Sequence, residues 1–231
     1  MKPEHTYETL LEREFEFLWL SHAEAILKVD FPDAIEELLS ALVEIDIPIE
    51  EIVGSGGGEA KGTQRLRRAL SDKGWNKVNF TIEKRINGEA KESISHEVDH
   101  VKKFPNGVIA LEIEWNNKDP FFDRDLENFK RLHAEGAISI GIIVTRGTSL
   151  QDAMRDLVLK FIQQNNISTF EGLAEFGYTP TARQKKTIID ASTRSNNPLS
   201  FEEAFVRQFV SDKFGAATTH WSKLEDRVKR G

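Results

Sequence analysis

The chain has 231 residues, of which 39% are hydrophobic and 30% are charged. This balance is typical of a soluble globular protein and excludes a disordered or fibrous chain. The chain contains no cysteine, which excludes disulfides, thiolate zinc sites and a cysteine nucleophile and is consistent with a reducing compartment. The N-terminus lacks an apolar signal core, and no apolar run of about 18 residues occurs. We therefore expect a cytoplasmic protein without a signal peptide or a membrane span.

The net charge of −7 is unevenly distributed. Residues 1–60 contain three basic and fifteen acidic residues, so the remaining 171 residues carry a net charge of +5. Such an asymmetry is a hint that one part of the chain faces a polyanion such as a nucleic acid. An ordinary solvated surface explains the same numbers equally well.

The N-terminal part, residues 1–53, is expected to be an acidic helical layer. Apolar residues recur at helical spacing over residues 6–29, and a second helix, opened by a proline, is expected at 32–45. Both helices carry their acidic residues on the side away from the apolar stripe. They are therefore expected to cover one face of a core.

A glycine-rich loop and a short helix follow. Residues 54–63 contain four glycines in five positions, so neither a helix nor a strand is expected there. The loop is not a Walker A loop, because Gly62 rather than serine or threonine follows Lys61. The next helix is expected to have Thr63 as its N-cap and to end at Gly74.

From residue 78 the apolar period changes from that of a helix to that of a strand. The expected elements are a strand at 78–86, a strand at 92–104, a strand at 108–115, a helix at 122–136 and a strand at 137–145 that is buried on both faces. Further helices are expected at 150–164 and 200–213. This order predicts an α/β fold with a mixed central sheet flanked by helices.

Residues 96–100, His-Glu-Val-Asp-His, match the H-E-x-x-H pattern of zinc proteases. The pattern binds zinc only on a helix, where positions i and i+4 share a face. The surrounding sequence alternates, is rich in β-branched residues and leads into a Pro-Asn-Gly turn, so a strand is expected instead. His96 and His100 are then expected on the strand face opposite to Asp99.

Three acids are expected to converge on the hairpin that follows. A two-residue turn at 106–107 pairs Asp99 with Glu114, and strand alternation places Glu112 on the same face as Glu114. Opposed side chains lie roughly 5 Å apart and diagonal ones roughly 7–8 Å apart. Three like charges destabilise a sheet unless a cation offsets them, and hard oxygen ligands favour Mg²⁺ over Zn²⁺. The alternative is that the acids solvate an exposed strand face, but the following helix and strand predict that both faces are covered.

The order D-x12-E-x-E on a strand–turn–strand unit, then a helix and a buried strand, resembles the PD-(D/E)XK nuclease core. More closely, "GGGEAKGTQRLRRALSDKGW", "SHEVDHVKKFPNGVIALEIEWNNKDPFFDRDLENFKRLHAEGAISIGIIVTRG" and the tail "TTHWSKLEDRVKRG" are similar to type II restriction endonucleases of the BglII/BamHI kind. The resemblance covers residues 54–147 and 216–231. The long ordered block is much more specific than the three acids alone.

This resemblance implies a single nuclease domain over residues 1–231, with the catalytic core at 54–147 and a helical C-terminal part at 148–231. It implies a homodimer that uses Mg²⁺ to hydrolyse double-stranded DNA at a short palindrome. A cognate DNA methyltransferase is expected in the same restriction-modification system.

The resemblance also implies roles for the three acids. Asp99 and Glu112 would bind Mg²⁺, and Glu114 takes the last position of the E-x-(K/E/Q) element, where lysine is usual. Without that lysine, a second metal ion or a carboxylate must act on the attacking water. No proline precedes Asp99, which is a minor departure. Candidates for a fourth active-site group are Glu59, Asn76 and Asn79.

Basic and amide side chains are candidate DNA contacts, because they bind phosphates and purine edges. Those near the glycine loop and after the third strand are Arg65, Arg67, Arg68, Asn116, Asn117 and Lys118. Flexible loops expected at 181–186 and 194–197 add Arg183, Lys185, Lys186, Arg194, Asn196 and Asn197. A solvated helix face and ordinary turns are the alternative explanation.

Three other functions remain open at this point. A junction-resolving or DNA-repair nuclease of the same fold would carry the same acids. A catalytically silent DNA-binding module would have no reason to hold three acids together. A zinc protease requires residues 96–100 to be helical.

Overall fold

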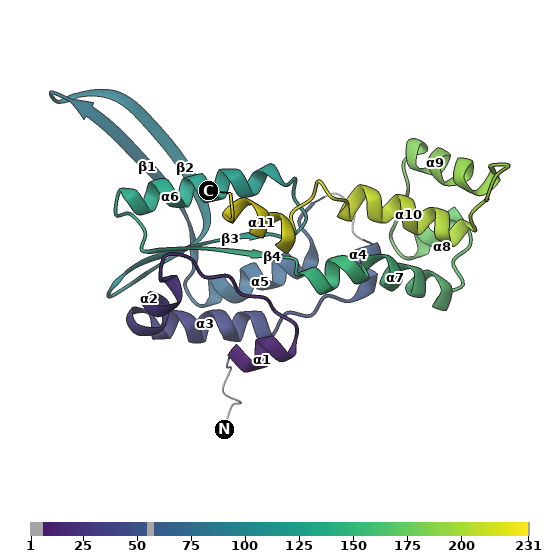
Figure 1. The fold of residues 1–231 in the computed structure, drawn as a ribbon, viewed down its shortest axis with the longest axis horizontal. Coiled ribbons are helices and arrows are strands. Elements are labelled where there is room, and N and C mark those ends of the chain that lie inside the picture. The colour runs from purple at the N-terminus through teal and green to yellow at the C-terminus, as the bar shows by residue number, and fades with distance from the viewer. Residues whose placement is uncertain (1–6, 55–57, 231) are drawn as a thin grey trace.

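The computed structural model describes residues 7–54 and 58–230 (Figure 1). The described elements are α1 (Tyr7–Glu12), α2 (Ala23–Asp30), α3 (Pro32–Val43), α4 (Ile49–Val53), α5 (Lys61–Asp72), β1 (Asn76–Ile86), β2 (Glu89–Phe104), β3 (Gly107–Glu114), α6 (Pro120–Ala134), β4 (Ile140–Thr145), α7 (Thr148–Gln164), α8 (Phe170–Glu175), α9 (Ala182–Thr193), α10 (Phe201–Phe214) and α11 (Trp221–Val228). In the described part of the chain, every helix is too short or too polar to cross a membrane.

The four strands form one mixed sheet in the order β1-β2-β3-β4. The first three strands pair antiparallel, and β3 pairs parallel with β4. Parallel pairing needs a crossover connection, which α6 supplies. The expected α/β fold with a mixed sheet and flanking helices is therefore confirmed.

Helices cover both faces of the sheet (Figure 1). On one face α2, α3 and α5 pack with the sheet around Trp75 and Leu111. On the other face α6 packs through Phe129 and Leu132. A side chain at Gly141 would put its Cβ 2.5 Å from the Phe129 ring, so this glycine allows α6 to approach β4 closely.

A helical lobe lies at one end of the sheet (Figure 1). Helices α4, α7, α8, α9 and α10 surround a separate core that includes Phe161, Phe205 and Phe209. After the lobe the chain returns to the sheet, where α11 contacts α6. Residues 148–231, which were expected to be helical, therefore contribute both to the lobe and to the layer beside the sheet.

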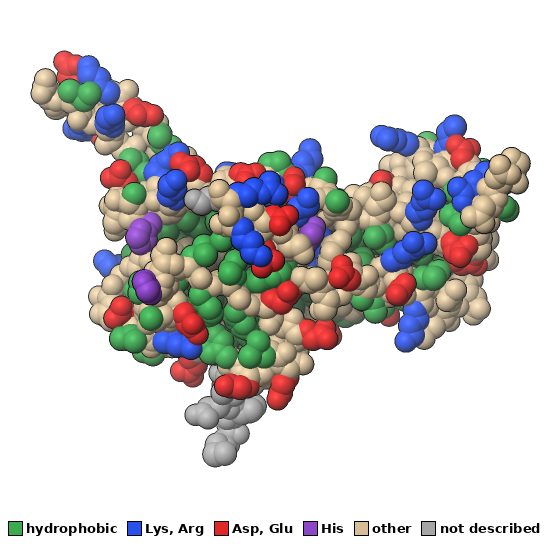
Figure 2. All heavy atoms as spheres, viewed as in Figure 1, with side chains coloured by type: hydrophobic (Ala, Val, Ile, Leu, Met, Phe, Trp, Pro, Cys, Tyr) green, Lys and Arg blue, Asp and Glu red, His purple; other side chains and the backbone are tan. Residues whose placement is uncertain are grey.

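Figure 2 shows more acidic than basic side chains over α1–α3, whereas the lobe carries both kinds. The negative net charge is thus concentrated in the N-terminal layer, as the composition of residues 1–60 indicates.

The expectation of one helix over residues 6–29 is wrong, because α1 and α2 are separated by a non-helical segment. In that segment Phe17 and Trp19 stack with ring centroids 6.0 Å apart, and both contact the ring of Tyr7 edge-on. Residues two apart share a side only in an extended segment. Glu14, with a φ of 61°, makes the turn out of α1.

The helix expected at 32–45 is confirmed as α3. The helix expected after Thr63 begins earlier, at Lys61, with Ala60 as its N-cap. Thr63 therefore lies inside α5 instead of capping it. Residues 55–57 of the predicted glycine loop lie outside the described residues.

The predicted β2–β3 register is wrong by two residues. The turn is formed by residues 105–106, and Phe104 pairs with Gly107. The side chain of the turn asparagine, Asn106, donates a hydrogen bond of 2.9 Å to a backbone carbonyl of α2, which holds the turn at this position. An even shift keeps every side chain on its face. In this register Asp99 is level with Glu112 rather than with Glu114.

Two further expectations are corrected. The strand expected at 137–145 corresponds to β4, which is an edge strand with mostly half-buried side chains, so it is not buried on both faces. Residues 181–186 are not a loop, because α9 begins at Ala182 with a capping box formed by Thr181 and Gln184. Residues 194–197 are non-helical, as expected.

Candidate active site

A bulge in β2 turns two neighbouring side chains toward the same cleft. The β1–β2 register shifts between Asn76 and Val78, so that Lys77 faces two residues of β2, Asp99 and His100. Both residues line the cleft. Bulges occur next to active sites because they re-aim a side chain. The expectation that His100 lies opposite to Asp99 is therefore wrong.

The zinc-protease alternative is wrong, because residues 96–100 are part of a strand. His96 lies near α6, where burial and then the charge of Arg124 lower its pKa. His100 lines the cleft and is within 3.3 Å of the backbone oxygen of Leu111 through its Nδ1. The two imidazoles thus lie in different surroundings and do not form the shared face that the pattern needs.

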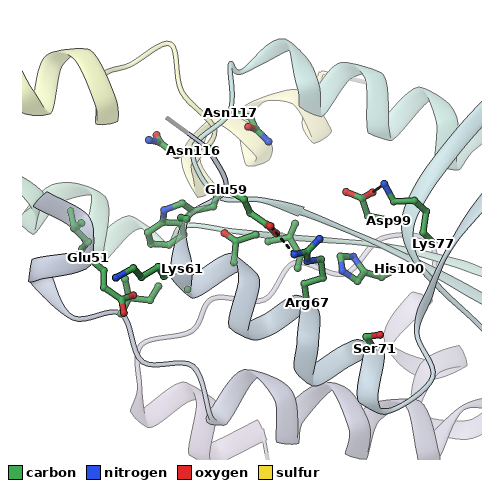
Figure 3. Close-up of a pocket in the computed structure, with 18 of the residues that line it drawn as sticks. Glu51, Glu59, Lys61, Arg67, Ser71, Lys77, Asp99, His100, Asn116 and Asn117 are labelled. Carbon is green, nitrogen blue, oxygen red and sulfur yellow. Dashed lines mark ion pairs between the residues drawn. The ribbon is translucent and has the colours of Figure 1, made fainter. Parts of the chain in front are cut away.

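Asp99 is half exposed in the cleft and forms an ion pair with Lys77. Its Oδ1 lies 3.0 Å from Lys77 Nζ, which also contacts Glu97 at 2.8 Å. Figure 3 shows the Asp99 carboxylate beside the lysine ammonium. Hydrogen bonds to these two carboxylates raise the pKa of Lys77 above its usual range. Lys77 therefore remains a cation next to Asp99.

Glu112 is buried on β3, with 4% of its surface exposed. Burial, followed by the charges of Asp125 and Asp99, raises the pKa of Glu112 to about 8, although the hydrogen bond with the Asp99 backbone opposes the shift. Its charged form is therefore unfavourable unless positive charge is supplied.

Glu114 is also buried, with 2% exposed, and is held by two neighbours. Asn117 Nδ2 donates to its Oε2 at 2.5 Å, and Arg124 Nη2 donates to its Oε1 at 3.3 Å. Burial raises the pKa of Glu114 to about 7, while the bond from Asn117 lowers it and contact with Asp125 raises it.

Asp125, which the sequence analysis missed, completes this group of buried acids. It is fully buried on α6, its Oδ1 lies 2.7 Å from Arg124 Nη2, and its Oδ2 has no hydrogen-bond partner among the described residues. One signal was available. Asp125 takes an apolar-stripe position between Phe122 and Phe129, at the i, i+3 and i+7 positions of the helix.

The substitution Asp125→Asn tests whether this acid destabilises the neighbouring buried carboxylates. We expect the metal-free variant to unfold at a higher temperature, because Asp125 disfavours the charged forms of Glu112 and Glu114 and this repulsion is removed. We also expect DNA cleavage to fall by about 10- to 100-fold, because Asp125 orients Arg124 and Glu114. Thermal unfolding in EDTA and cleavage kinetics measure the two effects. Equal unfolding temperatures for the variant and the wild type would contradict the first.

The cleft beside these acids has a volume of about 640 Å³. It is bounded by the N-terminal end of α5, the bulge in β2, the segment after β3 and the end of α10. Figure 3 shows Lys61 and Arg67 on its α5 side, with Arg67 paired to Glu59 at 3.1 Å. Lys61 and Arg67 of α5 and Lys77 of β1 thus bring positive charge to the cleft. Such cations can bind a phosphate backbone.

The structure separates the candidates expected near this cleft into two groups. Those that line the cleft are Glu59, Asn76, Arg67, Asn116 and Asn117. Those whose described contacts lie elsewhere are Asn79, Arg65, Arg68 and Lys118. Arg65 forms a two-pronged ion pair with Glu51, which is a structural role. Asn79 accepts a hydrogen bond from Ser95, and Lys118 forms a β-bridge with Thr218.

The candidates on the lobe do not line the cleft. Lys185 lies over the Phe170 ring and Lys186 pairs with Asp190 on the same helix. The loop candidates after α9 are Arg194, Asn196 and Asn197. Figure 1 shows the loop between α9 and α10 at the end of the lobe away from the sheet, and none of these three residues lines the cleft.

In residues 7–54 and 58–230 no three His, Asp or Glu side chains converge in a way that could hold a metal ion. The donor chemistry still fits Mg²⁺, since Asp99, Glu112 and Glu114 supply only hard oxygen ligands. Burial is the main cause that raises the pKa of Glu112 and Glu114, and a bound cation would favour their charged forms. The metal assignment stays a prediction.

A mixed α/β sheet with buried acids at the end of its central strands, beside a cleft with basic walls, is consistent with a nuclease of the restriction-endonuclease kind. The chain belongs to the restriction endonuclease BglII/BglIII family, whose model matches residues 15–231. It is therefore a site-specific deoxyribonuclease. No curated protein matches the chain.

Proposed function

We propose that the protein is a type II restriction endonuclease with a PD-(D/E)XK core, which hydrolyses double-stranded DNA at a short palindromic site with Mg²⁺. The observation that carries the proposal is the buried pair Glu112 and Glu114 beside Asp99 and a cleft with basic walls. Membership of the family supports DNA as the substrate. The carboxylates support the use of a metal ion, because a divalent cation stabilises most the charged form of buried acids whose pKa is raised.

Each acid has a separate task in this proposal. Asp99 and Glu112 hold the cation. Glu114, fixed by Asn117 and Arg124, orients the attacking water and accepts its proton. When bound, Mg²⁺ supplies charge neutralisation at the scissile phosphate and lowers the pKa of a bound water.

The remaining elements of the proposal concern partners. A palindromic site presents the same sequence to two copies of an active site, so the enzyme acts as a homodimer that cuts both strands. Host DNA must be protected at the same sequence, which requires a cognate DNA methyltransferase. A junction-resolving or repair nuclease is the second candidate, and it differs in preferring branched or damaged DNA.

Digestion of a sequenced plasmid tests the proposal. We expect discrete fragments with Mg²⁺ and intact plasmid with EDTA, because the buried acids need the cation. Sequencing the fragment ends gives the site, and symmetric cuts on the two strands identify a palindrome. Cleavage that persists in EDTA, or a smear without discrete fragments, would count against a metal-dependent site-specific enzyme. Preferential cleavage of a four-way junction would favour the second candidate.

A further inference from the structure

The segment that leaves β3 is pinned by the segment that follows α10. The Asn117 backbone N–H donates to Thr219 Oγ1 at 3.0 Å, and the Thr219 N–H donates to the Asn117 carbonyl at 2.9 Å. The Asp119 N–H donates to the Ala217 carbonyl at 3.0 Å. The two segments therefore lie side by side like a short pair of strands.

Arg146, at the end of β4, is 1% exposed and contacts both of these segments. Its guanidinium donates to Trp115 O at 2.8 Å, Gln151 Oε1 at 2.9 Å, Thr218 Oγ1 at 3.2 Å and Asn116 Oδ1 at 3.5 Å. It also lies over the rings of Trp115 and Phe214, at 5.7 and 5.0 Å from their centroids. One side chain thus contacts the β3 exit, α7, the end of α10 and the segment after it.

These four acceptors are all neutral, which is unusual for a buried cation. Burial lowers the pKa of Arg146 to about 10. A buried charge without an ion pair destabilises the fold relative to an apolar residue of similar size. Arg146 instead fixes the relative positions of its four acceptors, because a guanidinium holds five N–H donors in one fixed plane.

A chain of contacts connects Arg146 to Glu114 in the candidate active site. It holds the backbone of Trp115 and the side chain of Asn116, which flank Asn117 on its N-terminal side. Asn117 in turn donates to Glu114 at 2.5 Å. Through Phe214 the same residue contacts α10 of the lobe.

We propose that Arg146 is a positioning residue that holds the segment 115–117 so that Asn117 fixes the Glu114 carboxylate, and that it ties this segment to the C-terminal lobe. The inference rests on the proposed function, in which Glu114 acts on the attacking water.

Kinetics of Arg146→Met and Asn117→Ala test this role. We expect each substitution to lower kcat about 10- to 100-fold. The KM for DNA should change less than about threefold, because Glu114 acts in the chemical step rather than in binding. The double variant should be no slower than the slower single variant, because both break the same chain of contacts.

Phe161→Leu is the matched control, because Phe161 lies in the lobe core, packs on the Phe176 ring and does not line the cleft. Thermal unfolding is measured for every variant. If Arg146→Met does not fold, Arg146→Lys and Thr218→Val remove only part of the contacts and should still lower kcat. A kcat loss no larger than that of Phe161→Leu at equal loss of stability overturns the inference, and so does additivity with Asn117→Ala.

Failure of the inference is distinguishable from failure of the proposed function. If Glu112→Ala cleaves as fast as the wild type, the proposed active site is wrong. If Glu112→Ala is inactive and the Arg146 variants behave like the Phe161→Leu control, only the positioning role is wrong.

Discussion

Glu112→Gln is expected to lower the rate of DNA cleavage about 10³-fold at saturating Mg²⁺. Glutamine has nearly the same shape but carries no charge, so the cation loses one of its two proposed carboxylate ligands. Binding of DNA should change little, because Glu112 is buried and is not among the residues that line the cleft. Single-turnover cleavage with Mg²⁺ and DNA binding with Ca²⁺ measure the two properties separately.

The control for this substitution is Glu127→Gln on α6. Glu127 is exposed and pairs with Arg131 at 3.3 Å, so its loss should leave cleavage unchanged. A Glu112→Gln variant that cleaves within about tenfold of the wild type would remove Glu112 from the catalytic machinery. Loss of both DNA binding and cleavage would instead indicate a folding defect, which thermal unfolding identifies.

In EDTA, the stability of the protein is expected to fall as the pH rises from about 5 to about 8. Glu112 and Glu114 have folded-state pKa values of about 8 and about 7, above the ordinary value of 4.5. The folded state therefore binds more protons than the unfolded state over this range, and stability falls with rising pH. The two acids together should account for about 2 kcal/mol or more of this loss.

Glu112→Gln/Glu114→Gln is the control that isolates these two acids from other titrating groups. The double variant should lose less stability than the wild type over the same range, and it should be the more stable protein at pH 8. Mg²⁺ should stabilise the wild type more at pH 8 than at pH 5.5, because the ionised acids bind it. A stability difference between wild type and variant that does not change with pH would contradict the raised pKa values. Chemical unfolding at each pH provides the measurement.

Much of the site follows from local pattern. Alternation places Glu112 and Glu114 on one face of β3 whatever the turn, because an error of two residues in register does not change the face. The wrong register therefore did not change the prediction that Glu112 and Glu114 share a face, and their catalytic role stays a prediction. The helix after β3 and the strand that follows it could likewise be predicted, from the spacing of their apolar residues and from the length of each segment.

Other features of the fold and the site could not be predicted from the sequence. The bulge at Lys77 re-aims Asp99 and His100 without any glycine or proline to mark it. The lobe candidates looked like loops because they are polar, although Thr181 and Gln184 form a capping box that begins a helix. Polarity alone does not separate a solvated helix face from a loop.

The sequence by itself determined the order of the elements, the mixed sheet and the acids on β3, because these depend on interactions between residues close in the chain. Tertiary structure decided which of the polar residues share a site. Asp125 and Arg146 reach the active-site region from α6 and the end of β4 only when the crossover packs on the sheet. The lowered pKa of Arg146 arises from burial, which no local pattern encodes.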